Sequence, residues 1–307
     1  MRLIDSHCHL EMLGDPDVAV ELARQDGLAA IIAIGIDVAS SRLAVGFADR
    51  FDDVFATVGL HPHDAGALDD TVLAELEILA RRSKVVAIGE CGLDFYRDLA
   101  PRDAQRRAFS AQIELARRAG LPLVVHVREA GDEAMAQLAD QADDLTVVMH
   151  CFSLPQYVDE CNARGYYASF AGNVTYKNAG DLRAAAARVR EDRIMVETDA
   201  PFLSPAPNRG NSNVPAWVVH TAAVVGEARG WDAARVAEVT TANARRAFLR
   251  RLWGVRPPSP AFRKREDPAP RAETGGPRAT AVAPRGRTPC TATARTISST
   301  ATSCAPS

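Results

Sequence analysis

Short runs rich in Val, Ile and Ala recur along the chain, and each is followed by a longer amphipathic stretch. The predicted strands begin near Arg2, Ala29, Val54, Lys84, Pro122, Leu145, Tyr166 and Arg193. Their spacing is close to the roughly 30 residues of one βα unit. Eight strands that alternate with helices over about 250 residues predict an α/β protein with a (β/α)8 TIM barrel.

Helical periodicity lies between the predicted strands. The predicted helices cover 17–25, 39–49, 71–82, 102–119, 129–140, 155–164, 179–190, 214–228 and 232–253. The main alternative fold is a doubly wound open sheet, which would place a Gly-rich phosphate loop after the first strand. The sequence there is Asp5-Ser6-His7-Cys8-His9. The barrel is therefore favoured.

The last part of the chain differs in composition from the rest. Proline, alanine, arginine and threonine dominate it, and its only large apolar residues are Phe262, Val282 and Ile297. Such a segment cannot bury enough surface to offset its ordering entropy. We expect a barrel domain over 1–255 and a disordered tail over 256–307. The tail composition fits a basic arm for nucleic acid and a non-native reading frame equally well.

Charge and composition limit the possible partners and compartment. The chain has a formal net charge of −3, so contacts with nucleic acid must come from a local basic patch. No apolar run approaches the roughly 18 residues of a membrane span, and Asp5 interrupts any signal peptide. The cysteines form no CxxC pair, as is typical of free thiols in a reducing compartment. We expect a cytoplasmic protein with no membrane contact and no obligate protein partner.

Metal-type side chains follow five of the predicted strands. They are His7, His9, Glu90, His126, His150 and Asp199. The carboxyl ends of barrel strands meet at the face where active sites lie, and His7 and His9, two apart, share one side of an extended strand. Four imidazoles and two carboxylates are costly to leave unpaired in a partly dry pocket. They suit one or two divalent cations (Zn, Mg or Mn) with a carboxylate able to bridge a pair.

Several motifs surround these candidate ligands. They are Ile4-Asp5-Ser6-His7-Cys8-His9, Val58-Gly59-Leu60-His61-Pro62-His63, Ala87-Ile88-Gly89-Glu90-Cys91-Gly92-Leu93-Asp94, Pro122-Leu123-Val124-Val125-His126-Val127-Arg128, His150-Cys151-Phe152-Ser153 and Glu197-Thr198-Asp199-Ala200-Pro201. With them the chain resembles the TatD family of metal-dependent hydrolases, in the amidohydrolase superfamily, over about residues 2–253.

The resemblance implies a barrel fold and two divalent metal ions, with Glu90 shared between them. It implies an activity similar to that of divalent-metal deoxyribonucleases, including 3′-5′ exonucleases. The family also includes enzymes that remove D-amino acids from tRNA. Two positions depart from its pattern: Leu154 stands where a glycine is usual, and Ser212 where a basic residue is frequent. The second departure removes a possible phosphate contact.

Hydrolysis of a phosphodiester needs an activated water and relief of negative charge, which two divalent ions about 3.5–4 Å apart can supply. We expect Glu90 to bridge the ions. One ion is then held by His7, His9 and Asp199, and the other by His126 and His150. Asp199 is also the natural proton acceptor from the attacking water. The alternative role for Asp199 is a helix N-cap before Pro201.

Five further side chains are predicted substrate contacts at the rim of the site: His61, His63, Tyr96, Arg128 and Arg209. An arginine can bind a phosphate through two N–H donors, and a tyrosine can stack on a base. Loop packing is the alternative for the two histidines. For Arg128 the alternative is an ion pair with Asp94 or Glu129, and for Arg209 a solvated loop position.

The leading functional hypothesis is a metal-dependent phosphodiesterase that acts on DNA or another nucleic acid. Deacylation of D-aminoacyl-tRNA, or hydrolysis of another ester or amide, would use the same ligands and differ at the rim. A non-enzymatic metal-binding protein is the alternative from another class, and it would be expected to lack one or more ligands. All six candidate ligands are present here.

Overall fold

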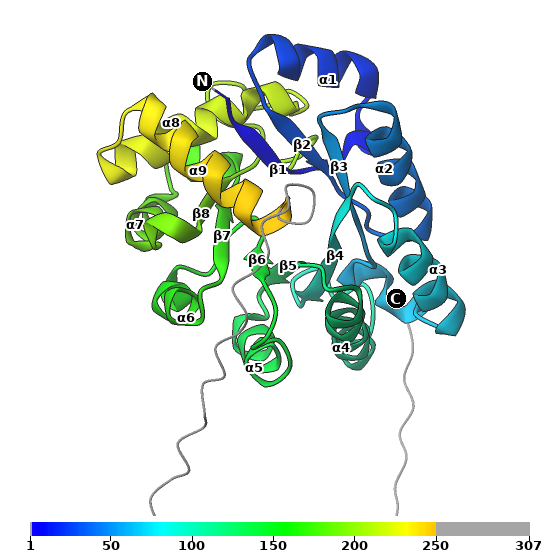
Figure 1. The fold of residues 1–307 in the computed structure, drawn as a ribbon. Helices are drawn as coiled ribbons and strands as arrows, with labels where there is room; N and C mark the ends of the chain where they lie inside the picture. The colour runs from blue at the N-terminus through cyan, green and yellow to red at the C-terminus, as the bar shows by residue number, and fades with distance from the viewer. Residues whose placement is uncertain (1, 250–307) are drawn as a thin grey trace, which may run out of the picture. The chain divides into compact units, whose positions relative to one another are not determined.

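The computed structural model describes residues 2–249, and it confirms the predicted (β/α)8 barrel (Figure 1). Parallel strands pair in the sequence order β1 to β8. Their bounds are Ile4–Cys8, Ala30–Ala33, Val54–Val58, Val85–Asp94, Leu123–Arg128, Val147–Met149, Tyr167–Phe170 and Ile194–Val196. The first strand meets the residues after the last one, since the His9 N–H donates to the Ala200 carbonyl at 2.8 Å.

Nine α-helices of the described part surround the strands, as Figure 1 shows. From α1 to α9 they span Pro16–Gln25, Val38–Arg50, Asp70–Ala80, Arg102–Ala119, Gly131–Gln141, Val158–Arg164, Gly180–Arg188, Val218–Arg229 and Ala233–Phe248. Two predicted helices begin instead as short 3-10 helices, η3 at Pro155–Tyr157 and η6 at Pro215–Trp217. In both cases a proline stands at the first position and an α-helix follows directly.

Local sequence signals set many of these helix ends. Four helices begin after an aspartate whose carboxylate accepts a backbone N–H three residues on: Asp15, Asp37, Asp69 and Asp232. This bond satisfies one of the unpaired N–H groups of the first turn. Three helices end at a left-handed glycine: Gly120, Gly165 and Gly230. Glycine adopts this conformation without the cost of a Cβ contact.

The two ends of the barrel interior differ in polarity. Apolar side chains from the first halves of the strands form an interior cluster that includes Ile4, Ile32, Val86, Val124, Val148 and Met195. The last turn of α9 adds Ala247 and Phe248 to this cluster, so the amino-terminal end is packed with hydrocarbon. The opposite, carboxyl-terminal end holds a cluster of buried polar side chains that includes His7, Glu90, His150 and Asp199. A polar site can therefore form inside the barrel at that end.

Strand β4 is longer than predicted. Its expected end at Glu90 is wrong, because the strand continues to Asp94 and pairs residues 91–94 with β5. Two glycines of β4 permit its close approach to β5. A Cβ on Gly89 would lie 2.4 Å from the Val124 carbonyl oxygen, and one on Gly92 would lie 2.1 Å from that of His126. Glu90 and Asp94 consequently both belong to β4.

Strand β8 is shorter than predicted, since it ends at Val196 and Asp199 lies in the loop beyond it. The Asp199 N–H donates to the His7 carbonyl at 2.9 Å, which fixes this loop against β1. No helix begins at Pro201, so the alternative role of Asp199 as a helix N-cap does not apply.

Within residues 2–249, no helix combines the length and apolar character needed to cross a bilayer. The predicted tail over 256–307, and the end of the predicted helix over 232–253, lie outside the described residues. The domain boundary at 255 stays a prediction.

Candidate metal centre

The six predicted ligands come together at the carboxyl-terminal end of the barrel. His7 belongs to β1, Glu90 to β4 and His126 to β5, while His9, His150 and Asp199 follow β1, β6 and β8. Each is buried or nearly so. Residues far apart in sequence therefore meet because parallel strands present their ends at one face.

Glu90 is the centre of this cluster. Its Oε2 lies 3.4 Å from His7 Nε2 and 3.7 Å from His9 Nε2. Its Oε1 faces other histidines, 2.9 Å from His126 Nδ1 and 3.1 Å from His150 Nε2. The two oxygens of one carboxylate thus address two separate pairs of imidazoles, which is the arrangement that a bridging ligand requires.

Asp199 completes the side of the cluster formed by β1. Its Oδ1 lies 3.6 Å from His7 Nε2 and 3.5 Å from His9 Nε2, and these two nitrogens are 3.3 Å apart. Three ligand atoms from one strand end and one loop therefore converge on the same small volume.

His61, predicted as a substrate contact, lies deeper than a rim residue. Its Nε2 is 3.6 Å from Glu90 Oε1, and it forms a possible ligand group with Glu90 and His126. The other possible groups are His7 with His9 and Glu90, and His7 with His150 and Asp199. The donor atoms within each group lie within 4.8 Å of one another. Imidazole and carboxylate donors this close suit divalent ions, so the residues fit the metals that the family uses.

Glu197 is a buried carboxylate to which the sequence analysis gave no role. Its Oε1 lies 2.9 Å from His150 Nδ1 and accepts the Cys151 N–H at 2.8 Å. A carboxylate on the far nitrogen of a histidine fixes which nitrogen faces a metal. The signal was present in the sequence, since Glu197 stands two residues before Asp199, but only the fold shows that it reaches His150.

Asp94 supports the other side of the cluster. Its Oδ2 lies 3.3 Å from His126 Nε2 and 2.9 Å from His63 Nε2. It also accepts the backbone N–H groups of Tyr96 and Arg97. His63 is therefore held by a carboxylate next to the site, and Asp94, considered in the sequence analysis only as a possible partner of Arg128, contacts two histidines instead.

The carboxylates of the cluster are held in their charged form. Burial raises the pKa of Glu90, but the surrounding histidines outweigh it and bring that pKa well below its ordinary value. Burial likewise opposes ionisation of Asp199, and the hydrogen bond with His9 lowers its pKa nevertheless. Both side chains can act as metal ligands at neutral pH.

The histidines differ among themselves. Burial lowers the pKa of His61 to about 3, and burial together with the charge of His150 lowers that of His7. Burial also disfavours charged His9, but hydrogen bonds with Asp199 and Glu11 raise its pKa to about 10. In the protein without metal, a proton on His9 therefore supplies positive charge beside the carboxylates of Asp199 and Glu11.

The arginines and tyrosine predicted at the rim are exposed. The Arg128 guanidinium lies 3.9 Å from the centroid of the Tyr96 ring, and Arg128 makes no ion pair with Asp94 or Glu129 within the described residues. Arg209 lies 3.8 Å from the centroid of Tyr176. Each predicted arginine is thus placed by stacking on an aromatic ring.

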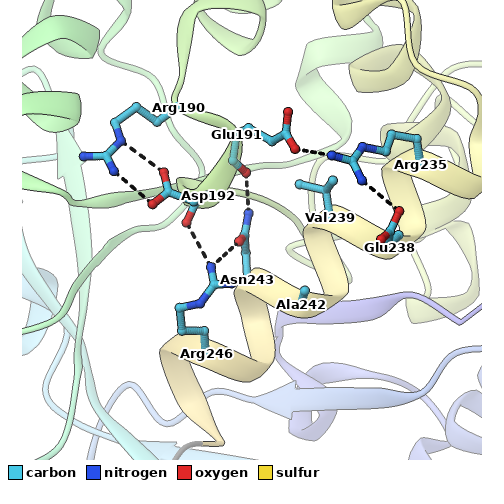
Figure 2. Close-up of a pocket in the computed structure, with 9 residues that line it drawn as sticks. All are labelled: Arg190, Glu191, Asp192, Arg235, Glu238, Val239, Ala242, Asn243 and Arg246. Atoms are coloured by element: carbon cyan, nitrogen blue, oxygen red, sulfur yellow. Dashed lines mark hydrogen bonds and ion pairs between the residues drawn. The ribbon is translucent and has the colours of Figure 1, made fainter. Parts of the chain in front are cut away.

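A separate cavity of about 480 Å³ lies at the other end of the barrel, before β8 (Figure 2). Its charged groups satisfy one another: Arg190 pairs with Asp192, and Arg235 pairs with Glu191 and Glu238. It holds none of the predicted ligands. We interpret the charged residues around this cavity as structural contacts between α9 and the residues at the start of β8.

A TIM barrel with this ligand cluster at its carboxyl-terminal end defines a metal-dependent hydrolase. The family model described as TatD related DNase matches residues 4–249. The chain belongs to the TatD family of metal-dependent hydrolases, as the sequence resemblance predicted.

Known relatives agree with this assignment. The chain is 35% identical over 251 residues to the uncharacterized metal-dependent hydrolase YabD of Bacillus subtilis, covering 80% of this chain and 98% of the relative. It is 38% identical over 243 residues to the 3′-5′ ssDNA/RNA exonuclease TatD of Cronobacter sakazakii, covering 77% and 92%. Among solved structures, the TatD homolog YJJV of Escherichia coli K12 matches with a TM-score of 0.75 and 29% identity, covering 80% and 98%.

Proposed function

We propose that the protein hydrolyses phosphodiester bonds of single-stranded DNA or RNA from the 3′ end, with two divalent metal ions. The observation that carries the proposal is the position of Glu90, whose two carboxylate oxygens face different pairs of histidines. The relative from Cronobacter sakazakii, named a 3′-5′ ssDNA/RNA exonuclease, supports the substrate class.

We assign six residues to the metal site: His7, His9, Glu90, His126, His150 and Asp199. Zn, Mg or Mn bound there would supply a Lewis acid for the phosphoryl group and would favour deprotonation of water. Glu90 would be shared between the two ions and is a catalytic residue in this scheme. Asp199 would accept the proton of the attacking water on a carboxylate oxygen.

The substrate contacts in this proposal are His61, His63, Tyr96, Arg128 and Arg209. The two arginines are exposed, and their guanidinium N–H groups can bind phosphate oxygens in pairs. Tyr96 is 54% exposed and can stack on a base. His61, which is also near Glu90, and His63 lie between the metal ligands and the rim.

The direct test is cleavage of a single-stranded oligonucleotide labelled at its 5′ end, with Mg, Mn or Zn added to protein stripped of metal. We expect a ladder of products shortened from the 3′ end, two metal ions per chain in elemental analysis, and no product with Glu90→Gln. Absence of cleavage with every metal, alongside deacylation of D-aminoacyl-tRNA, would replace the nuclease proposal by its alternative.

We also propose a cytoplasmic location. The cysteines of the described part, Cys8, Cys91, Cys151 and Cys161, are free thiols. Free thiols persist in a reducing compartment. Fractionation of cells that express the protein with a tag tests this location.

A further inference from the structure

Arg128 and Arg209 differ from the other stacked cations of the protein. Arg24, Arg102, Arg193 and Arg229, for example, also stack on aromatic rings, but each donates hydrogen bonds to protein oxygens. Within residues 2–249, Arg128 and Arg209 are the stacked cations whose guanidinium groups meet no protein acceptor. Their N–H donors are therefore available to a ligand.

The stacking itself prepares these arginines for an anion. A guanidinium that lies on a ring uses its face and keeps all its in-plane N–H donors. The Tyr176 ring is fixed by its hydroxyl, which donates to the Ser204 carbonyl at 3.2 Å. The Tyr96 N–H is bonded to Asp94, a neighbour of the metal centre. Arg209 is thus stacked on a ring that is itself held in place before a ligand arrives.

Three more cations of the described part also lack a protein acceptor, and two of them, Arg97 and Lys177, follow strands at the carboxyl-terminal end of the barrel. Among residues 2–249, five Lys and Arg side chains have no hydrogen-bond or ion-pair acceptor: Arg2, Arg97, Arg128, Lys177 and Arg209. Most of the other Lys and Arg side chains are bonded to carboxylates on the helices. Arg97 follows Tyr96 after β4, and Lys177 follows Tyr176 after η4 (Gly172–Thr175). Both are exposed.

Apart from Arg2, the unpaired cations form two groups on different sides of the carboxyl-terminal opening of the barrel, called the mouth below. Arg97 and Arg128 lie where β4 and β5 end, and Lys177 and Arg209 lie in the loops after β7 and β8. Near the first group, Asp94 contacts His63 and His126, and Asp98 pairs with Arg102, while Glu129 is exposed beside Arg128. A polyanion that crosses the mouth would meet positive charge on both sides of the metal centre.

We infer that these two groups bind backbone phosphates of a single polynucleotide strand at nucleotides beyond the scissile bond. The preferred substrate is then a chain of several nucleotides. This inference rests on the proposed function, to which it adds that affinity grows with strand length.

The test compares the metal-loaded enzyme on a dinucleotide and on a ten-nucleotide single strand. We expect the wild-type protein to have a KM at least about tenfold lower for the longer strand, since each charge-assisted contact contributes roughly a factor of ten. The double variant Arg128→Gln/Arg209→Gln should lose most of this preference, and Arg97→Gln/Lys177→Gln part of it. Arg2→Gln is the matched control, because Arg2 is exposed and unpaired but precedes β1 at the opposite end.

A binding measurement makes the inference independent of turnover. The fluorescence anisotropy of a labelled ten-nucleotide strand, read in EDTA at several salt concentrations, gives the dependence of log Kd on log salt. Loss of two phosphate contacts should reduce the slope by about 1.4, at about 0.7 for each contact to a single strand. An equal effect of Arg2→Gln, or equal KM values for both lengths in the wild type, would overturn the inference. Failure to cleave either strand would instead reject the proposed function, while the anisotropy would still test these cations.

Discussion

Single side chains in this protein act largely through the partners that orient them. His150 faces Glu90 with one nitrogen and Glu197 with the other, and His126 lies in the same way between Glu90 and Asp94. Each of these ligands therefore has a carboxylate on its far side. Such outer contacts determine how strongly a histidine ligand binds.

Glu197→Gln should weaken metal binding by about 10- to 100-fold, the range typical of such outer contacts. The amide keeps the volume but replaces the carboxylate that holds His150 at 2.9 Å. Calorimetric titration of metal-free protein with Zn or Mn measures the effect. Glu238→Gln, an exposed glutamate on α9, is the control and should bind metal as the wild type does. Unchanged affinity in Glu197→Gln would show that His150 needs no such support.

The Arg24–Asp53 pair gives a prediction of pH dependence. The hydrogen bonds from Arg24 lower the pKa of Asp53. A depressed carboxyl pKa contributes stability above the unfolded value of about 3.9 and loses it as pH falls toward the folded value. Both side chains are partly exposed, at 38% and 27%, so solvent screening keeps the contribution near 0.5–1 kcal/mol.

Asp53→Asn should accordingly lower the free energy of unfolding at pH 7 by that amount, and the difference should shrink as pH falls from about 5 to about 3. Urea unfolding at several pH values measures it. Asp52→Asn removes the same charge from a neighbouring exposed position and should have little effect. A difference that persists at pH 3 would assign the effect to something other than the ion pair.

At the scale of elements, hydrogen bonds join helix α9 to the residues before β1 and to the start of β8. Thr241 Oγ1 donates to the Arg2 carbonyl, and Asn243 Nδ2 donates to the carbonyls of Glu191 and Ile194 at 2.8 and 2.9 Å. Figure 2 shows Asn243 between the start of β8 and Arg246, which donates to its Oδ1. The helix thereby supplies donors to backbone carbonyls before β1 and at the start of β8.

Asn243→Ala should lower the free energy of unfolding by about 2 kcal/mol, because it leaves buried carbonyls without a donor. Chemical denaturation monitored by circular dichroism checks the value. Asn178→Ala, an exposed residue with no side-chain bond in the described part, should change stability little. If both variants are equally stable, water replaces the Asn243 amide and the bonds to β8 contribute nothing.

At the scale of the whole molecule, the family match lies within the described barrel. About 80% of this chain covers 98% of the relative from Bacillus subtilis, and the family match ends at residue 249. The interior cluster that closes the amino-terminal end is completed by Ala244, Ala247, Phe248 and Leu249. The residues that the barrel needs are thus contained in the described part.

A chain that ends at residue 255 should fold and turn over substrate as the full chain does, with a melting temperature within about 2 °C, which corresponds to about 1 kcal/mol or less for a domain of this size. Differential scanning calorimetry and the nuclease assay measure the two properties. A chain that ends at residue 242 is the contrasting variant and should be strongly destabilised, since it loses Phe248 and its neighbours. A fall of several degrees on removing only 256–307 would show that this segment contributes to the fold.

The sequence by itself determined the barrel and brought out the six metal-type side chains. Strand and helix periodicity are local properties, and the carboxyl ends of parallel strands must share one face, so ligands at strand ends can be read without coordinates. The helix caps at Asp15, Asp37, Asp69 and Asp232 are equally local.

Only the tertiary structure decided how those ligands are supported and where the free cations lie. The pairing of Glu197 with His150, the approach of His61 to Glu90 and the extension of β4 to Asp94 all depend on contacts between separate strands. Likewise, the stacking of Arg209 on Tyr176 joins two loops that are distant in sequence. Distances between strand ends follow from packing and register, which a pattern of residue types along one strand does not contain.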